Sequence, residues 1–181
     1  GPFTVFDVET TGMSPSRDRI VEIAALRVDL DGVRSEFQSL VNPGRPIPER
    51  VSAVHGITDV MVADAPQFKE VGYQFADFAA GSTLVAHNAR FDLGFLQESL
   101  FRNGLPIWKG KTMDTIPLIK QACPGLPSYS LQNLRVTFQL DHDAGPAHRA
   151  FADVEWTLDM LGIAFKRLLA LSPHHKKAKR R

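Results

Sequence analysis

The first strongly apolar segment of the chain contains two carboxylates that lie two residues apart. Asp7 and Glu9 interrupt residues 3–10, whose aromatic and β-branched side chains favour a strand. Residues i and i+2 of a strand face the same side, so the two carboxylates lie side by side. An isolated pair of this kind is typical of a strand end whose acids cap the next turn. The apolar flanks favour a divalent metal site instead, because two like charges beside a core need compensation.

Two later segments supply further acids and a base. Asp92 lies in the first turn of a predicted helix, where the helix dipole alone would also favour a carboxylate. Asp153 borders the apolar stripe of the last predicted helix and therefore needs a partner. His148 precedes it by five residues and suits a general base, since histidine titrates near neutrality. A surface histidine is the alternative reading of His148 taken alone.

Four carboxylates can hold two hard divalent cations, which prefer oxygen ligands. Two cations about 3.5–4 Å apart can stabilise the attacking and leaving oxygens of an in-line phosphoryl displacement. His148 completes the set as the base for the attacking water. The residues therefore indicate metal-assisted phosphodiester hydrolysis. A zinc site is disfavoured because the candidates are mainly carboxylates and Cys123 is the only cysteine.

The periodicity of the chain predicts five strands and several helices that would position these residues. The first three strands follow one another through short links, as in an antiparallel meander, and the first is central because it is the most apolar. The prediction is a mixed α/β sheet with helices on its faces. The predicted strands cover residues 3–10, 19–28, 34–41, 83–86 and 111–115, and the predicted helices cover 51–55, 66–81, about 90–101, 116–121, 131–138 and 146–171.

The length of 181 residues fits one domain, which we expect to cover residues 3–171. Residues 172–181 hold five of the 21 Lys and Arg residues and no acid, so they are expected to form a disordered basic tail. Such a tail could contact nucleic acid, lead to another domain or aid solubility. Gly1 and Pro2 resemble the scar left by protease cleavage of an expression tag.

The single Cys123 excludes an internal disulfide and fits a reducing compartment. It reads as a small, half-buried apolar residue rather than a nucleophile. No apolar run approaches the roughly 20 residues of a membrane span, and no signal peptide precedes the first strand. We therefore expect a cytoplasmic protein without membrane contact.

Three segments carry a resemblance to a known family. They are FDVETTGM (6–13), AHNARFD (86–92) and HRAFAD (148–153), supported by VHGIT (54–58) and MDT (113–115). In this order and spacing they resemble the DEDDh family of 3'→5' exonucleases, which has an RNase H-like fold. Within that family the chain is similar to the epsilon-like proofreading subunits of bacterial DNA polymerase III. The resemblance spans residue 3 to about residue 170.

The resemblance implies a five-stranded sheet of order 3-2-1-4-5 and two Mg²⁺ or Mn²⁺ ions. It implies that Asp7, Glu9 and Asp153 hold the metal that carries the nucleophilic water. Asp7 would bridge to the second metal, and Asp92 would act through a water. His148 would deprotonate the attacking water, and the products would be nucleoside 5'-monophosphates.

The resemblance also implies contacts with the terminal nucleotide, with Met13 as an apolar wedge beside the base. The substrate-binding residues it implies are Asp7, Glu9, Thr10, Gly12, Met13, His55, Phe91 and Asp153.

The resulting hypothesis is a 3'→5' exonuclease that acts on single-stranded or frayed DNA 3' ends in proofreading or repair. A replicative DNA polymerase subunit as partner, and association with a bacterial nucleoid, are implied by the resemblance only. Two alternatives stay open: an exonuclease that trims RNA 3' ends, and a nuclease-fold binding module without activity. Outside the tail, the mildly acidic chain argues against tight binding of long duplexes and fits a grip on a few terminal nucleotides.

Overall fold

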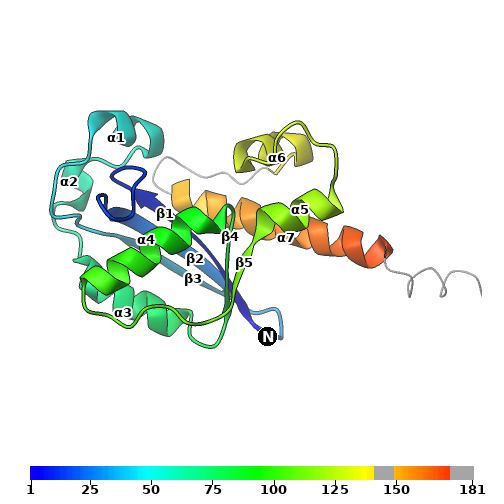
Figure 1. Ribbon diagram of the computed structural model, residues 1–181, viewed down its shortest axis with the longest axis horizontal. Helices are drawn as coiled ribbons and strands as arrows, with labels where there is room; N and C mark the ends of the chain where they lie inside the picture. Colours follow the sequence, from blue (N-terminus) through cyan, green and yellow to red (C-terminus); the bar gives the residue numbers. More distant parts are fainter. Residues whose placement is uncertain (141–148, 172–181) are drawn as a thin grey trace, which may run out of the picture.

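One five-stranded sheet forms the centre of the molecule. The computed structural model describes residues 1–140 and 149–171. The strand order is β3-β2-β1-β4-β5, as predicted, with the first three strands antiparallel and the last two parallel to β1 (Figure 1). The strands are β1 (Phe3–Thr10), β2 (Ile20–Val28), β3 (Arg34–Leu40), β4 (Thr83–Ala86) and β5 (Thr112–Asp114).

Strand β1 is central, and its two neighbours differ in length. It pairs with β2 along its whole length, from Phe3↔Val28 to Thr10↔Ile20. Its pairing with β4 ends at Val5↔Val85. The carboxyl half of β1, which carries Asp7 and Glu9, is therefore open on the β4 side.

Seven helices lie within the described residues (Figure 1). All the helices predicted from the periodicity are present, with ends shifted by up to three residues. The four-residue helix α2 was not predicted, because it is too short to show a helical period. The helices are α1 (Glu49–His55), α2 (Asp59–Val62), α3 (Phe68–Phe78), α4 (Ala89–Arg102), α5 (Thr115–Ala122), α6 (Leu131–Phe138) and α7 (Arg149–Leu171).

The two faces of the sheet are covered by different helices. On one face Phe6 and Val8 of β1 pack with Phe75 of α3 and with Phe95 of α4. On the other face Val5 and neighbouring strands pack against α7, and α5 and α6 pack on the outer side of α7. Because side chains alternate along a strand, Asp7 and Glu9 share the α7 face with Val5.

Two expectations about burial have clear outcomes. Cys123 is buried, more completely than the half-buried position expected of it. The helical spacing of Leu93, Leu96, Leu100 and Phe101 predicts that Phe101 lies on the buried stripe of α4. This prediction is wrong, since the side chain of Phe101 is 73% exposed. Leu100 already points to the core, and one further residue turns Phe101 by about 100° away from it.

Among the described residues, no helix combines the length and apolarity needed to cross a lipid bilayer. The predicted tail, residues 172–181, and the predicted base His148 both lie outside the described residues.

Candidate active site

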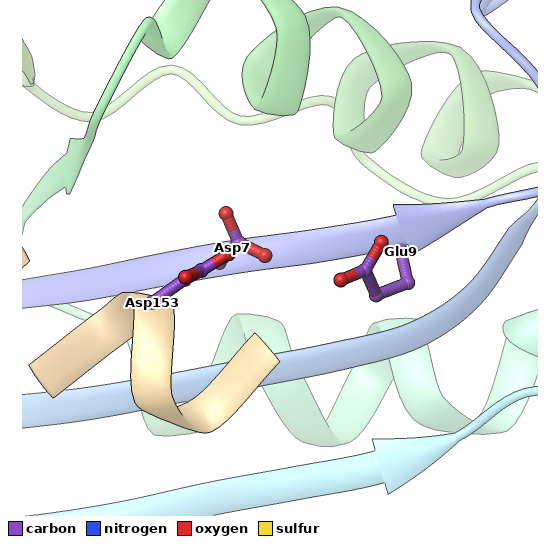
Figure 2. Close-up of side chains that lie close together, drawn as sticks. All are labelled: Asp7, Glu9 and Asp153. Atoms are coloured by element: carbon purple, nitrogen blue, oxygen red, sulfur yellow. The ribbon is translucent and has the colours of Figure 1, made fainter. Parts of the chain in front are cut away.

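Three carboxylates from two elements converge at the carboxyl end of β1. Asp7 and Glu9 come from the strand, and Asp153 comes from the beginning of α7, which packs over β1 (Figure 2). One oxygen atom of each carboxylate lies within 4.8 Å of the other two. The structure therefore brings Asp153 together with Asp7 and Glu9, and their role as metal ligands stays a prediction.

Asp92 lies beside this cluster, on α4, and is only 3% exposed. Its Oδ1 accepts a hydrogen bond of 3.2 Å from the backbone N–H of Val8. Val8 lies beyond the last residue of β1 that pairs with β4. The Asp92 carboxylate therefore accepts the hydrogen bond that the backbone of a neighbouring strand would otherwise accept. Asp92 is not one of the three residues whose oxygens lie within 4.8 Å of one another.

Burial and mutual repulsion make negative charge costly in this cluster. Burial raises the pKa of Asp7 well above its ordinary value, and the nearby Asp92, Asp153, Glu9 and Glu22 raise it further. Burial also raises the pKa of Asp92 to about 8, although the hydrogen bond from Val8 opposes this shift. Bound cations would relieve both effects, and hard divalent ions prefer oxygen-only donor sets of this kind. The residues present therefore fit a Mg²⁺ or Mn²⁺ centre.

Glu22 is a further acid at this site that the sequence reasoning missed. It pairs directly with Glu9 across the β1–β2 ladder, so both side chains lie on the same face of the sheet. Glu22 is 3% exposed, and its Oε1 accepts a hydrogen bond of 2.8 Å from Gln38. The sequence signal that could have identified Glu22 is its position as an acid within the apolar segment of β2.

The turn after β1 is held by its own hydrogen bonds. The Thr10 hydroxyl donates to the carbonyl of Gly12 at 2.6 Å, and the backbone of Thr11 bonds to the carbonyl of Arg19 at 2.8 Å. A side chain at Gly12 would come within 2.5 Å of the Asp18 carboxylate. The need for glycine here therefore has a local cause, and a nucleotide contact at Thr10 or Gly12 stays a prediction.

The remaining predicted substrate residues differ in exposure. Met13 is 80% exposed on the turn, so it is accessible to a ligand. Phe91 is partly buried and packs on Phe95 with ring centroids 4.9 Å apart. His55 is 3% exposed, its Nδ1 accepts from the N–H of Ile57, and its Nε2 lies 3.2 Å from the carbonyl of Thr10. His55 therefore ties α1 to the end of β1, and its contact with a nucleotide stays a prediction.

His87 is a structural histidine. Its Nδ1 lies 2.8 Å from the Thr115 hydroxyl, and its Nε2 lies 2.8 Å from the carbonyl of Tyr129. A carbonyl only accepts, so Nε2 donates and Nδ1 accepts from the hydroxyl. Burial lowers the pKa of His87, which keeps the ring neutral. The predicted base, His148, is outside the described residues and its placement is untested.

The comparisons with known proteins agree with this geometry. A family profile described as "Exonuclease" (RNase_T) matches residues 4–161. The DNA polymerase III subunit epsilon of Treponema pallidum is 39% identical over 177 residues, which cover 97% of this chain and 78% of that protein. An epsilon-like protein of Rhodobacter capsulatus is 44% identical over 92% of this chain, but the match spans only 23% of its length.

A solved structure is similar over most of both chains. Exonuclease X, in complex with 5' overhanging duplex DNA, has 32% sequence identity and a TM-score of 0.70, with 91% of each chain covered. The similarity thus extends over nearly all of the fold that positions the acidic cluster.

Proposed function

The chain belongs to the exonuclease family, and from that premise we propose that it hydrolyses DNA from the 3' end with the help of divalent cations. The observation that carries this proposal is the convergence of Asp7, Glu9 and Asp153 within 4.8 Å at the end of β1. The names of the relatives support DNA as the substrate: one is a DNA polymerase III subunit, and one was solved with duplex DNA. A binding module without activity would not need to keep this costly set of acids together.

Asp7, Glu9 and Asp153 would hold one Mg²⁺ or Mn²⁺ ion, and Asp7 and Asp92 would contribute to a second. When bound, such ions supply positive charge for the attacking and leaving oxygens of an in-line displacement. The protein contributes the fixed spacing of the acids, since β1 pairs with β2 along its whole length and α7 packs on its face.

His148 takes the proton of the attacking water. The water oxygen forms a bond to phosphorus, and the bond between phosphorus and the 3' oxygen of the penultimate nucleotide breaks. The leaving oxygen takes up a proton from solvent. The products are a nucleoside 5'-monophosphate and a strand shortened by one nucleotide with a free 3' hydroxyl.

Several substrate contacts accompany this chemistry. Met13, exposed on the turn after β1, packs against the terminal base, and Phe91 supports the same nucleotide. Thr10, Gly12 and His55 shape the pocket around its sugar and phosphate. Residues 3–171 constitute the exonuclease domain, and residues 172–181 are a basic extension.

The wider role is proofreading or repair on single-stranded or frayed 3' ends. A replicative polymerase subunit as partner, and a cytoplasmic location with access to the nucleoid, rest on the likeness to the epsilon subunit of Treponema pallidum. Other relatives are much longer than this chain, so the partner depends on the protein in which the domain operates.

The test compares matched single-stranded DNA and RNA oligonucleotides in Mn²⁺, each labelled at the 5' end in one sample and at the 3' end in another. We expect the 3' label to be released first as a mononucleotide, and DNA to be degraded faster. Faster degradation of RNA would instead support the RNA-trimming alternative. No degradation of either polymer with Mn²⁺ would leave the binding module as the better description.

A further inference from the structure

A polar cavity with two arginines lies away from the acidic cluster. It has a volume of about 110 Å³, and Arg19, Asn42, Gln67, Arg102 and Asn103 are among the residues that line it. Its apolar floor includes Ile20, which pairs with Thr10 at the carboxyl end of β1. Ile20 packs in the core beneath α3 and α4, so the cavity opens on the opposite face of the sheet from Asp7.

Three arginine side chains gather around this cavity and the adjacent turn. Arg102 Nη2 donates to the carbonyls of Pro15 and Ser16 at 3.0 and 3.1 Å, and Arg19 Nη1 donates to the carbonyls of Arg17 and Asp18. The side chain of Arg45 also donates to the carbonyl of Arg17. Three guanidinium groups thus converge on one turn from three separate segments.

Positive charge is in excess here. Burial lowers the pKa of Arg19, and repulsion from Arg102 and Arg45 lowers it further. The nearby acids are Asp18 and Glu98, the second in an ion pair of 3.2 Å with Arg102. The cluster is therefore more positive than the rest of residues 1–171, where acids outnumber bases.

One donor of the cluster has no protein partner. Arg102 Nη1 is buried and makes no hydrogen bond with any of the described residues. A buried donor on a charged group is costly to leave unsatisfied, so it calls for a ligand or an ordered water. A guanidinium fork can bind the oxygens of a phosphate through two parallel, charge-assisted hydrogen bonds.

We propose that this arginine-lined cavity binds a backbone phosphate of the nucleic acid strand whose 3' end lies at the acidic cluster. This inference rests on the proposed function for the identity of the ligand, and on the cavity and its unsatisfied donor for the site. A phosphate bound in the cavity would hold the strand at a second point, remote from the bond that is cut.

The length of α4 determines the distance between the acidic cluster and the arginine-lined cavity. Asp92 and Arg102 are ten residues apart on α4, which corresponds to about 15 Å along the helix. At about 3.4 Å per nucleotide of a stacked strand, this distance equals roughly four to five nucleotides. A dinucleotide is therefore too short to fill both sites, whereas a strand of ten nucleotides can.

The test measures binding of a dinucleotide and of a ten-nucleotide DNA strand by fluorescence anisotropy in EDTA, over a range of salt concentrations. The variants are R102Q and Q67E. Gln67 lines the cavity, and its side chain makes no hydrogen bond with the described residues, so Q67E adds a negative charge without removing a side-chain hydrogen bond. The control is R34Q, which removes a positive charge at the far end of the β2–β3 ladder.

In R102Q and Q67E we expect the ratio of ten-nucleotide to dinucleotide affinity to fall about tenfold. The slope of log K against log salt should fall by about 0.7 when one single-strand phosphate contact is lost, as in R102Q. R34Q should keep the parent ratio. An unchanged ratio in both R102Q and Q67E would overturn the inference.

One further measurement distinguishes free phosphate from a strand phosphate as the ligand of the cavity. Another distinguishes failure of this inference from failure of the proposed function. If inorganic phosphate raises the melting temperature of the parent but not of Q67E, while ten-nucleotide binding is equal in both, the cavity takes free phosphate and the strand assignment is wrong. Hydrolysis of a p-nitrophenyl ester of thymidine 5'-monophosphate in Mn²⁺ reports the acidic cluster alone. Its failure would count against the proposed function, whereas the anisotropy ratio would still decide the cavity.

Discussion

Asp7 lies close to four other acids of the site. Burial and the neighbouring Asp92, Asp153, Glu9 and Glu22 all raise its pKa. Its ionised form is therefore unfavourable in the metal-free protein and becomes favourable only when a cation is bound. This single residue links the stability of the fold to the chemistry.

The substitution D7N tests this link. Asn has nearly the same shape as Asp but no charge, so the metal-free variant should melt at a higher temperature than the parent. Hydrolysis of DNA should fall by about a thousandfold or more, because a cation ligand is lost. Thermal melts in EDTA and rate measurements in Mn²⁺ check both effects. A metal-free variant less stable than the parent, with normal activity, would contradict the assignment.

His148 has a separable role as the base. H148A should slow hydrolysis by about 10²–10⁴-fold, since a general base is lost, while Mn²⁺ binding stays as in the parent. Isothermal titration calorimetry measures the Mn²⁺ affinity, and single-turnover kinetics measure the rate of hydrolysis. Loss of Mn²⁺ binding in H148A would mean that the histidine supports the metal rather than the water.

A side chain at the end of a strand fixes the position of helices around the site. Asp114, at the end of β5, accepts from the N–H of Ile116 at 2.8 Å and from the N–H of Ala89 at 3.0 Å. It therefore caps α5 and also binds the first residue of α4, the helix that carries Asp92. One carboxylate thus fixes the beginning of two helices.

We expect D114A to lower the free energy of unfolding by about 2 kcal/mol, since a capping side chain is lost at one helix and a second backbone donor is left unpaired. D114N should cost less, because its carbonyl oxygen can still cap α5. Chemical denaturation of the three proteins gives the comparison. Equal losses in D114A and D114N would show that the charge of Asp114, rather than its two acceptors, is what matters.

The strand and helix patterns of the sequence were sufficient to predict most elements and the central position of β1, whereas the full sheet order was predicted from the family resemblance. The alternation in residues 3–10 predicted that Asp7 and Glu9 share a face, and the apolar stripe of α7 placed Asp153 at its border. The position of Glu22 opposite Glu9 could not be predicted, because strand register depends on the exact length of the turn between β1 and β2. The hydrogen bond from Val8 to Asp92 likewise depends on where β4 ends.

The arginine cavity was also outside the reach of sequence patterns. Arg19, Arg45 and Arg102 are far apart in the sequence, and none of them belongs to a motif. They meet only because the residue before β2, the loop after β3 and the end of α4 all lie near the turn after β1. Helix α2 was missed for a different reason: its four residues are too few to show a helical period.

The stability of the whole molecule should depend on pH in a direction set by its raised carboxyl pKa values. The ordinary pKa of Asp92 is 3.8, and it is about 8 in the folded protein. Between these values the folded state holds more protons than the unfolded state, so the free energy of unfolding falls as pH rises. This contribution is complete below pH 4 and is lost as pH passes through about 8; the slope is at most about 1.4 kcal/mol per pH unit for each proton.

Divalent cations should reverse this trend. In EDTA the contribution of Asp7 and Asp92 makes the parent less stable at pH 8 than at pH 5.5, whereas Mn²⁺ should stabilise it increasingly as pH rises, because protons must leave before the metal binds. Thermal melts with EDTA and with Mn²⁺ at several pH values measure the difference. The variant D92N serves as the control and should show a flatter pH dependence in EDTA. A Mn²⁺ effect that shrinks as pH rises would be inconsistent with this linkage.

The most direct test of the acidic cluster as a catalytic centre uses Asp153, the ligand that α7 brings to β1. Release of nucleoside 5'-monophosphates from 3'-labelled single-stranded DNA is measured in Mn²⁺ for the parent and for D153N, with circular dichroism to confirm that both are folded. The parent should release mononucleotides from the 3' end, and folded D153N should be slower by about a thousandfold or more. Equal rates for the two folded proteins would contradict the site proposed at Asp7, Glu9 and Asp153.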